Sequence, residues 1–302
     1  MTVDTYAEFR QELLDAGLLF DTGVDGLYGR SSTFQGVADA LDAMVSRWAG
    51  ELSATVVHFP PIIARTTFAK TNYIESFPDL MGSVHIFRGN DRDHAELLRR
   101  LEGGGDWPAL LEPAEVVLAS ASCHPVYGLC TGEVPEDGRR FEIHGYCFRH
   151  EPSIDPSRMQ AFHMHEVVYV GTPEAAERHR DEGLRRGLAM LSDLGLDMEA
   201  VPANDPFFGR LGTALAVGQL EEALKMEGVT PVCSTDRPTA IMSANYHRDH
   251  FGVPFKITTP DGAVAHSSCV AFGVDRITLA LLHTHGLDVS RWPTEVRGRL
   301  WS

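Results

Sequence analysis

The order of the strand-like segments constrains the fold of this chain more than any other feature of its sequence. Runs rich in apolar and β-branched residues follow one another in two groups, at 141–150 and 162–170 and at 239–245, 253–259 and 263–271. Consecutive strands of a parallel sheet need a long crossover between them, and these groups leave no room for one. We therefore expect an α+β fold in which helices flank an antiparallel sheet.

Apolar residues at helical spacing predict the elements that surround this sheet. The expected helices are 4–16, 33–48, 92–101, 173–194, 213–226 and a C-terminal helix from Gly273. Within residues 92–101, the side chains of Leu97, Leu98 and Leu101 are expected to point inward. Further strands are expected at 54–61 and 115–120.

Two features bear on how the chain is divided. The Gly-rich segment GVDGLYGRSS (23–32) predicts a loop, which would be either a lid over a bound ligand or a simple turn. No long polar linker interrupts the chain, so we expect a single domain over 1–302.

Composition and charge narrow the class of protein. The chain has 26 Lys and Arg against 42 Asp and Glu, a formal net charge of −16, which disfavours a broad nucleic-acid-binding surface. No apolar run reaches the roughly 18 residues that a membrane-spanning helix needs, and the polar N-terminus does not resemble a signal peptide. Five cysteines without a CxxC pair do not indicate a disulfide framework. We expect a cytoplasmic protein that binds no membrane.

The most informative segment is GYCFRHEPSIDPSRMQAFHMHEVVYVG, residues 145–171. It is typical of two strands joined by a polar loop, and alternation along each strand separates its side chains onto two faces. If the faces coincide, one surface carries Cys147, Arg149, Glu151, Phe162, Met164 and Glu166. His163 and His165 take the opposite face. Guanidinium groups suit a polyphosphate and an aromatic ring suits a stacked base, although a solvated hairpin with surface ion pairs fits the same spacing.

The pattern FRxE, a loop and RxxxFxxxE is similar to the second signature motif of class II aminoacyl-tRNA synthetases at every defined position. The segment CVAFGVDRITLALL (269–282) resembles the third motif, with Asp275 in place of the usual glutamate before Arg276. Residues 33–61 loosely resemble the first motif. In that superfamily the first motif builds a homodimer interface, so the resemblance implies a homodimer and a class II synthetase-like sheet.

The same resemblance implies roles for five residues. Arg149 would hold the α-phosphate of ATP and the amino-acid carboxylate while the adenylate forms. Arg158 and Arg276 would hold the outer phosphates. Phe162 would stack on adenine, and Glu151 would accept a hydrogen bond from the adenine amino group. Mg²⁺ would accompany ATP, since it bridges phosphate oxygens.

Several side chains are candidate metal ligands, because thiolates, imidazoles and carboxylates bind zinc. The candidates are Cys123, Cys130, Cys147, Cys233, Cys269, His124, His163, His165 and His266. Their spacing alone identifies no site. The alternation of the strand at 162–170 turns His163 and His165 away from Glu166, so we interpret these two histidines as backing residues.

Along most of its length the chain resembles the amino acid:[carrier protein] ligases, truncated homologues of the archaeal-type seryl-tRNA synthetases. The segments that carry this resemblance are GLYGRSS (26–32), FPP (59–61), ESFPDLMGSVHIF (75–87), SCHPVY (122–127), FFGR (207–210), NYHRDHFG (245–252) and HSSCVAFGVDR (266–276). The branch binds Zn²⁺ through Cys, Glu and Cys, which places the ligands at Cys123, Glu166 and Cys269. Cys130 and Cys233 would be bystanders.

The resemblance implies a zinc-dependent ligase that activates a small amino acid, glycine or alanine, with ATP. It would transfer the aminoacyl group to the phosphopantetheine thiol of an acyl or peptidyl carrier protein and would have no separate tRNA-binding domain. The arginines of 173–194, or Arg210, would meet an acidic carrier, although a solvated helix face is favoured. Two alternatives remain: a minimal seryl-tRNA synthetase-like enzyme that charges tRNA, and a non-catalytic paralogue that binds amino acid or nucleotide.

Overall fold

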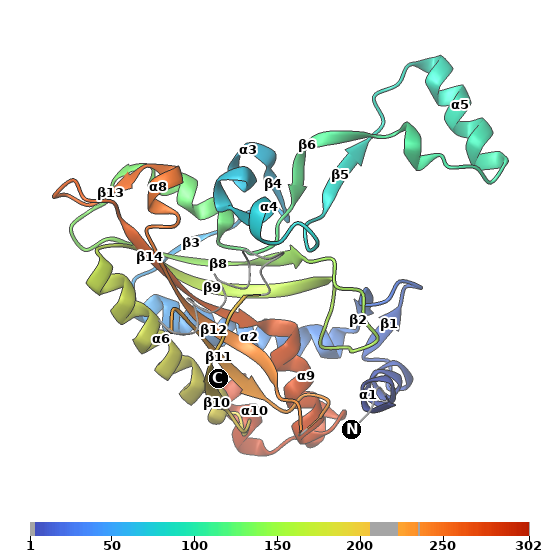
Figure 1. Cartoon of the computed structure of the whole chain (residues 1–302). Helices are drawn as coiled ribbons and strands as arrows, with labels where there is room; N and C mark the ends of the chain where they lie inside the picture. The colour runs from blue at the N-terminus through green and yellow to red at the C-terminus, as the bar shows by residue number, and fades with distance from the viewer. Residues whose placement is uncertain (1–3, 206–222, 235, 302) are drawn as a thin grey trace.

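A seven-stranded sheet organises the protein (Figure 1), for which a computed structural model describes residues 4–205, 223–234 and 236–301. Its strands, in spatial order, are β10 (Glu199–Pro202), β11 (Lys225–Thr230), β12 (Thr239–Arg248), β14 (His266–Gly273), β9 (Ala161–Gly171), β8 (Arg139–Phe148) and β3 (Thr55–Val57). Every neighbouring pair is antiparallel except β3 and β8. The expected α+β class and antiparallel sheet are therefore confirmed.

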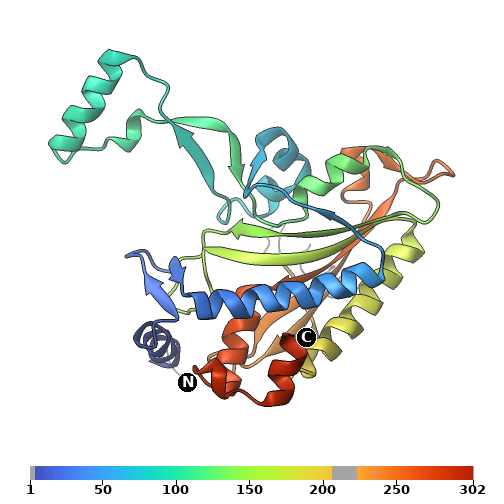
Figure 2. The same ribbon diagram turned by 180° about the vertical axis from the view of Figure 1, so that it is seen from behind.

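Helices pack on one face of this sheet and form the main core with it (Figure 2). The helices are α1 (Asp4–Asp15), α2 (Ser32–Glu51), α6 (Pro173–Ser192), α9 (Val274–His285) and α10 (Thr294–Leu300). Ser31 caps α2 by accepting a hydrogen bond from the backbone N–H of Phe34. The indole of Trp48 meets the ring of Phe272 edge-on, with centroids 6.1 Å apart. This apolar layer leaves the opposite face of the sheet free for a site.

Short elements border that opposite face. They are a three-stranded sheet of β4 (Ile62–Ala64), β6 (Glu112–Leu118) and β5 (Ser83–Ile86), the helices α3 (Arg65–Phe68), α4 (Tyr73–Ser76) and α8 (Gly252–Phe255), the paired strands β7 (Gly132–Glu133) and β13 (Ile257–Thr258), and the 3-10 segments η1 (Ala69–Thr71) and η3 (His124–Cys130). A further 3-10 segment, η2 (Pro108–Leu110), precedes β6. Near the N-terminus, β1 (Leu19–Asp21) pairs with β2 (Tyr28–Arg30). A last 3-10 turn, η4 (Val289–Arg291), precedes α10.

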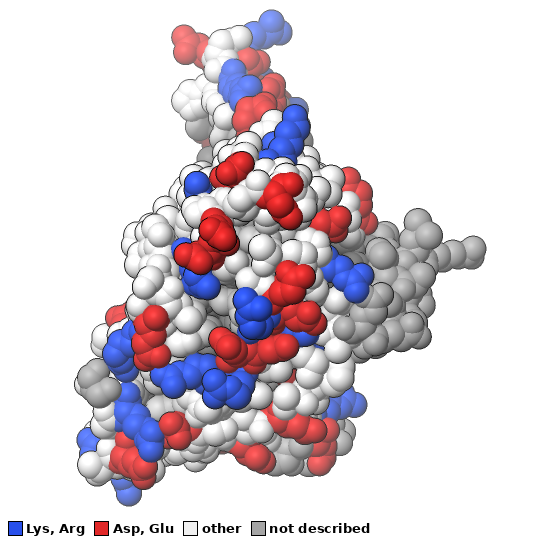
Figure 3. Space-filling view, turned by 90° about the vertical axis from the view of Figure 1, so that its left-hand side faces the viewer, with Lys and Arg blue, Asp and Glu red and all other residues white. Residues whose placement is uncertain are grey.

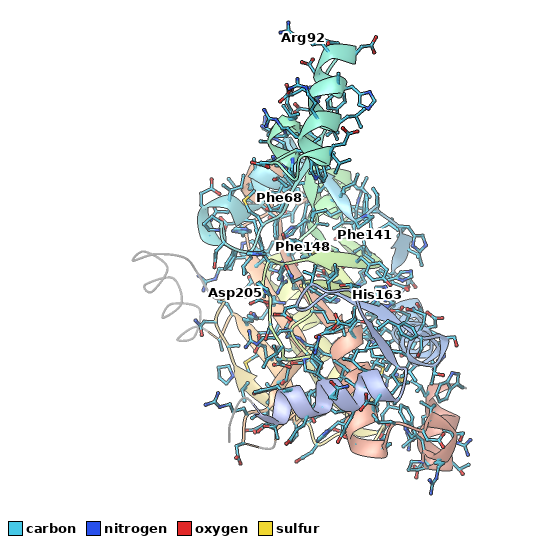
Figure 4. All side chains as sticks on the ribbon, turned by 90° about the vertical axis from the view of Figure 1, so that its right-hand side faces the viewer. Phe68, Arg92, Phe141, Phe148, His163 and Asp205 are labelled. Carbon is cyan, nitrogen blue, oxygen red and sulfur yellow. The ribbon has the colours of Figure 1, made fainter. Side chains whose placement is uncertain are left out.

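The helix α5 (Asp91–Glu102) lies on an arm that extends away from the body (Figures 1 and 4), and Arg92 is labelled at its far end. Leu98 and Leu101 are 42% and 54% exposed, and Leu97 is only half-buried. The helix was predicted, but the expectation that these leucines point inward is wrong. The arm carries α5 away from the hydrophobic core clusters of the described residues, none of which contains a residue of this helix.

Three further expectations differ from the structure. Residues 253–259 are not one strand, because Pro254 lies in the short helix α8 and only Ile257–Thr258 pair as β13. The segment 23–32 is not wholly a loop, since Tyr28–Arg30 pair with β1. The helix expected at 213–226 falls largely outside the described residues, as do FFGR and Arg210, and its last two residues begin β11.

The surface carries acidic and basic side chains interspersed rather than in single-sign fields on the side drawn in Figure 3. On α6, Arg186 pairs with Glu51 at 3.2 Å and Arg180 is buried, so the arginines of this helix do not form a uniform basic face. Among the described residues, no helix has the length and apolar character that crossing a membrane requires.

We predict that Gly183→Ala lowers the free energy of unfolding by about 1–3 kcal/mol. A methyl group at Gly183 of α6 would collide with Cγ2 of the fully buried Val270 on β14. The matched control is Gly36→Ala on α2, where a new methyl meets no atom of the described residues within 4 Å. Because alanine favours the helix by about 0.5–1 kcal/mol over glycine, that control is expected to be neutral or stabilising. Equal effects of the two variants in urea denaturation would contradict the close α6–β14 packing.

Candidate active site

A cavity of about 440 Å³ opens on the face of the sheet opposite the large helices. All the predicted site residues except Arg158 line it: Cys123, Arg149, Glu151, Phe162, Glu166, Cys269 and Arg276. They come from the neighbouring strands β9 and β14, from the loop that follows β8, from the start of α9 and from the segment before η3. The fold therefore brings together the two predicted groups, the arginine-aromatic set and the cysteine-glutamate set.

Arg149 and Phe162 lie together at the end of the β8–β9 hairpin. The strands pair Cys147 with Phe162, and the backbone N–H of Arg149 donates to the carbonyl of Gln160. The guanidinium carbon of Arg149 lies 5.3 Å from the centre of the Phe162 ring, and its Nε donates to the carbonyl of Ser120 at 3.1 Å. The side chain is thus oriented by two contacts before any ligand binds.

Arg276 enters the same cavity from the first turn of α9. Its Nε donates to the carbonyl of Ser157 at 2.8 Å and a terminal nitrogen donates to the carbonyl of Ala240 at 3.0 Å. Burial lowers the pKa of this guanidinium, and the nearby positive charge of Arg149 lowers it further. Two like charges in a partly buried space favour a polyanionic ligand, since its charge would offset both.

Arg158 lies at the rim rather than in the wall. Its side chain is 56% exposed and lies 3.8 Å from carboxylate oxygens of Glu151 and of Asp155. The guanidinium can therefore reach a ligand from the solvent side only by leaving these weak ion pairs.

Cys123, Glu166 and Cys269 converge deeper in the cavity. All three are buried, and the two sulfur atoms and a carboxylate oxygen lie within 4.8 Å of one another. Register explains the meeting of two of them, because Glu166 pairs with Ala271 and so shares its face with Cys269, two residues along β14. Oε1 of Glu166 accepts hydrogen bonds from the hydroxyl of Ser122 at 2.8 Å and the backbone N–H of Cys123 at 3.1 Å.

The chemistry of this trio fits a soft divalent cation. A hydrogen bond with Cys269, burial and the charge of Glu166 all raise the pKa of the Cys123 thiol well above its ordinary value. Three negative donors cannot all ionise in so small a buried space unless a cation joins them. Two thiolates and one carboxylate form a typical zinc set with one position left for a further ligand.

Imidazoles beside the trio are neutral. Burial lowers the pKa of His124 to about 3 and that of His247 to about 3. Nε2 of His247 lies 3.6 Å from the sulfur of Cys269, and its Nδ1 lies 3.1 Å from the hydroxyl of Ser267. These rings therefore add no positive charge near the thiols at neutral pH.

The other candidate ligands lie elsewhere. Cys130, Cys147 and Cys233 are buried but are not among the atoms that converge with Glu166. His266 bonds to the hydroxyl of Tyr246 at 2.6 Å. The imidazoles of His163 and His165 lie on the helix-covered side of the sheet with Asp42 of α2, as the alternation of the strand predicted.

Sequence reasoning missed several polar residues of the cavity. Lys225 on β11 lies 2.6 Å from Asp205 and 3.0 Å from Glu227, and Asn245 on β12 donates to the sulfur of Cys269 at 3.4 Å. Asn245 belongs to NYHRDHFG, whose resemblance was noted without a role. Nothing in the spacing of Lys225 distinguishes it from a solvated lysine.

A buried ion pair fixes the start of α9. Arg30 on β2 lies 2.7 Å from Asp275, and the two side chains are 10% and 2% exposed. The same carboxylate accepts the backbone N–H of His163 at 2.6 Å. Burial raises the pKa of Asp275 to about 6, although Arg30 opposes the change. The pair joins the β1–β2 hairpin to the helix turn that carries Arg276.

Comparisons with known proteins agree with this geometry, although no protein-family model matches the chain. The amino acid–[acyl-carrier-protein] ligase 1 of Bradyrhizobium diazoefficiens is 41% identical over 282 residues, which cover 93% of this chain and 86% of that protein. The type-2 serine–tRNA ligase of Methanopyrus kandleri is 26% identical over 283 residues, covering 86% of this chain and 53% of that protein. The crystal structure of M. kandleri SerRS with A. aeolicus tRNASec has a TM-score of 0.81 and 23% identity, over 97% of this chain and 60% of that one. The expected class II synthetase-like fold is confirmed.

We predict strong coupling between Arg30 and Asp275 in a double-mutant cycle at pH 8. Arg30→Met and Asp275→Ala are each expected to destabilise by about 3–5 kcal/mol, since each leaves a buried charge unpaired, and the double variant by clearly less than the sum. Below about pH 6 the carboxyl takes up a proton, so the coupling is expected to shrink. The control is the more exposed pair Arg10–Asp21, 3.0 Å apart, for which coupling below about 1 kcal/mol is expected. Additive effects at both pairs would show that the contact between Arg30 and Asp275 does not stabilise the fold.

Proposed function

This chain belongs to the amino acid–[acyl-carrier-protein] ligase family, and we propose from this premise that it activates a small amino acid with ATP and transfers it to a carrier protein. The observation that carries the proposal is a single cavity that joins Arg149, Phe162 and Arg276 to Cys123, Glu166 and Cys269. The arginine-aromatic residues alone, or the cysteine-glutamate residues alone, would support this function less well than both together. The acceptor group is the phosphopantetheine thiol of the carrier.

In the first step the amino-acid carboxylate attacks the α-phosphorus of ATP, and pyrophosphate leaves. Arg149 stabilises the charge that develops on the α-phosphate, and Arg276 with Arg158 binds the outer phosphates. Phe162 stacks on adenine, and Glu151 accepts a hydrogen bond from its amino group. Mg²⁺ would accompany ATP and would offset part of the phosphate charge. Positioning and charge are sufficient for this chemistry, so no side chain need transfer a proton to the phosphate.

Cys123, Glu166 and Cys269 would hold zinc in this proposal, and the ion would supply a Lewis acid to which the α-amino group of the substrate could bind. Selection then depends on a free amine and on the space beside it, which favours glycine or alanine. Ser122 supports the set through its hydrogen bond to Glu166. The fixed carboxylate orientation is what a metal ligand needs from its neighbours.

In the second step the carrier thiol attacks the mixed anhydride and AMP leaves. A net charge of −16 is unhelpful for binding a polyanion such as tRNA, which supports the thiol as acceptor. The proposal includes a single catalytic domain over 1–302 and a homodimer formed through the region of α2.

Amino-acid-dependent exchange of pyrophosphate into ATP tests the activation step without a partner. We expect exchange with glycine or alanine and with few other amino acids. Transfer is then tested with a phosphopantetheine-loaded carrier protein, with the same carrier lacking the arm, and with total tRNA. A labelled product on the loaded carrier alone supports the proposal. Charging of tRNA instead, or no exchange with any amino acid, overturns it.

We predict that Arg149→Ala lowers kcat/KM for exchange by about 10²–10³-fold, because the lost guanidinium stabilises charge that develops in the transition state. The matched control is Arg92→Ala at the far end of the α5 arm (Figure 4), which is exposed and is expected to leave exchange unchanged. If Arg149→Ala retained wild-type exchange, the assigned role would be wrong.

We predict that Cys123→Ala and Cys269→Ala each remove one equivalent of tightly bound zinc per chain and abolish amino-acid-dependent exchange. Cys130→Ser and Cys233→Ser remove buried thiols outside the trio and serve as controls that keep the metal. Zinc is counted by elemental mass spectrometry after exhaustive dialysis. Full zinc and activity in the Cys123 and Cys269 variants would exclude these ligands.

A further inference from the structure

A second cluster of metal-ligating side chains lies on the other side of the sheet, between the β8–β9 hairpin and α2. Within the described residues, donor atoms of Asp42, His144 and His165 lie within 4.8 Å of one another, as do those of the cysteine-glutamate trio. The strand register brings the histidines together, because His144 pairs directly with His165 across the two strands. Asp42 reaches them from the middle of α2.

The donor atoms around Asp42 lie at distances that bracket the separation of two ligands of one tetrahedral ion. Oδ1 of Asp42 is hydrogen-bonded to Nδ1 of His165 at 2.8 Å, and Oδ2 lies 3.4 Å from Nδ1 of His163 and 3.9 Å from Nδ1 of His144. Ligands about 2.0–2.1 Å from a tetrahedral zinc are about 3.3 Å apart. His163 is therefore close enough to supply a fourth ligand in addition to Asp42, His144 and His165.

The cluster also contains an unsatisfied buried nitrogen. Nδ1 of His163 is buried, lies 3.4 Å from Asp42 and makes no hydrogen bond to any described residue, whereas Nε2 of His165 faces the carboxylate of Glu142 at 3.3 Å. His165 is fully buried and His163 is 8% exposed. A buried polar nitrogen without a partner is unfavourable, and a bound ion would satisfy one.

The charge of the surroundings suits a divalent cation. Glu142 on β8 lies 3.3 Å from Nε2 of His165 and is itself held by a hydrogen bond from the hydroxyl of Ser46. Two carboxylates, those of Asp42 and Glu142, thus border three imidazoles. The nearby guanidinium of Arg30 is paired with Asp275 and donates to the hydroxyl of Tyr146 at 2.6 Å. Second carboxylates that hold a ligating histidine are a common feature of zinc sites.

We propose that Asp42, His144 and His165, with His163 as a fourth donor, bind a second zinc ion that joins α2 to the β8–β9 hairpin. Nitrogen and carboxylate donors in this arrangement suit zinc, and four protein donors suit a structural ion rather than a catalytic one, although the side chain of His144 is 32% exposed. The ion would hold α2 against the strands whose opposite face presents Phe162 and Glu166 to the cavity.

Counting and spectroscopy on the full chain test this proposal. We expect two zinc equivalents per chain in dialysed protein, with Asp42→Ala and His144→Ala each reduced to one. After replacement by Co²⁺, these variants are expected to keep the thiolate-to-cobalt charge-transfer band of the cysteine site. Cys123→Ala is expected to lose that band and keep one equivalent. His94→Ala on the exposed arm is the matched control and is expected to keep both equivalents.

A direct measurement covers the case in which a histidine variant fails to fold. X-ray absorption at the zinc edge of Cys123→Ala is expected to show a first shell of nitrogen and oxygen only. A single equivalent in the wild-type protein would overturn the proposal. So would sulfur in the shell of the remaining zinc, or two equivalents retained in folded His144→Ala.

Discussion

The hydrogen-bonded ladder of β8, β9 and β14 is the constraint on which the site depends. Because opposite residues of antiparallel strands share a face, pairing Glu166 with Ile143 on one side and Ala271 on the other points its carboxylate into the cavity. A slip of one residue would turn Glu166 into the helix layer and His165 into the cavity. Burial of Val167 and Val270 against the helices opposes that slip. Packing of the apolar core therefore determines which side chains of these strands point into the cavity.

Local alternation made much of this arrangement predictable. Phe162, Met164 and Glu166 line the cavity on the face that period-two spacing assigned to them, and Cys123 and Cys269 meet Glu166 although 146 positions separate the two cysteines. Spacing alone did not identify that trio; the family resemblance did. The long antiparallel strands were predictable because they contain runs of apolar residues, which are buried over most of their length.

The features that the sequence did not predict depend on contacts between residues far apart in the chain. Leu98 and Leu101 have core-like spacing, yet the arm that carries them leaves them exposed, since periodicity says which residues share a face but not what that face meets. Asn245 and Lys225 become cavity residues only because β11 and β12 extend the sheet beyond β14. The two histidines assigned as backing residues do lie behind the site, but the aspartate that meets them comes from a helix more than 100 positions earlier.

The ion pair between Arg30 and Asp275 has a consequence for synthesis of the chain. The two residues are 245 positions apart, so during translation Arg30 leaves the ribosome long before its carboxylate exists. Until α9 emerges, docking the β1–β2 hairpin would bury an unpaired guanidinium, which is strongly unfavourable. We therefore expect the β1–β2 hairpin to dock only after the segment that contains Asp275 has been made, so that this contact forms late.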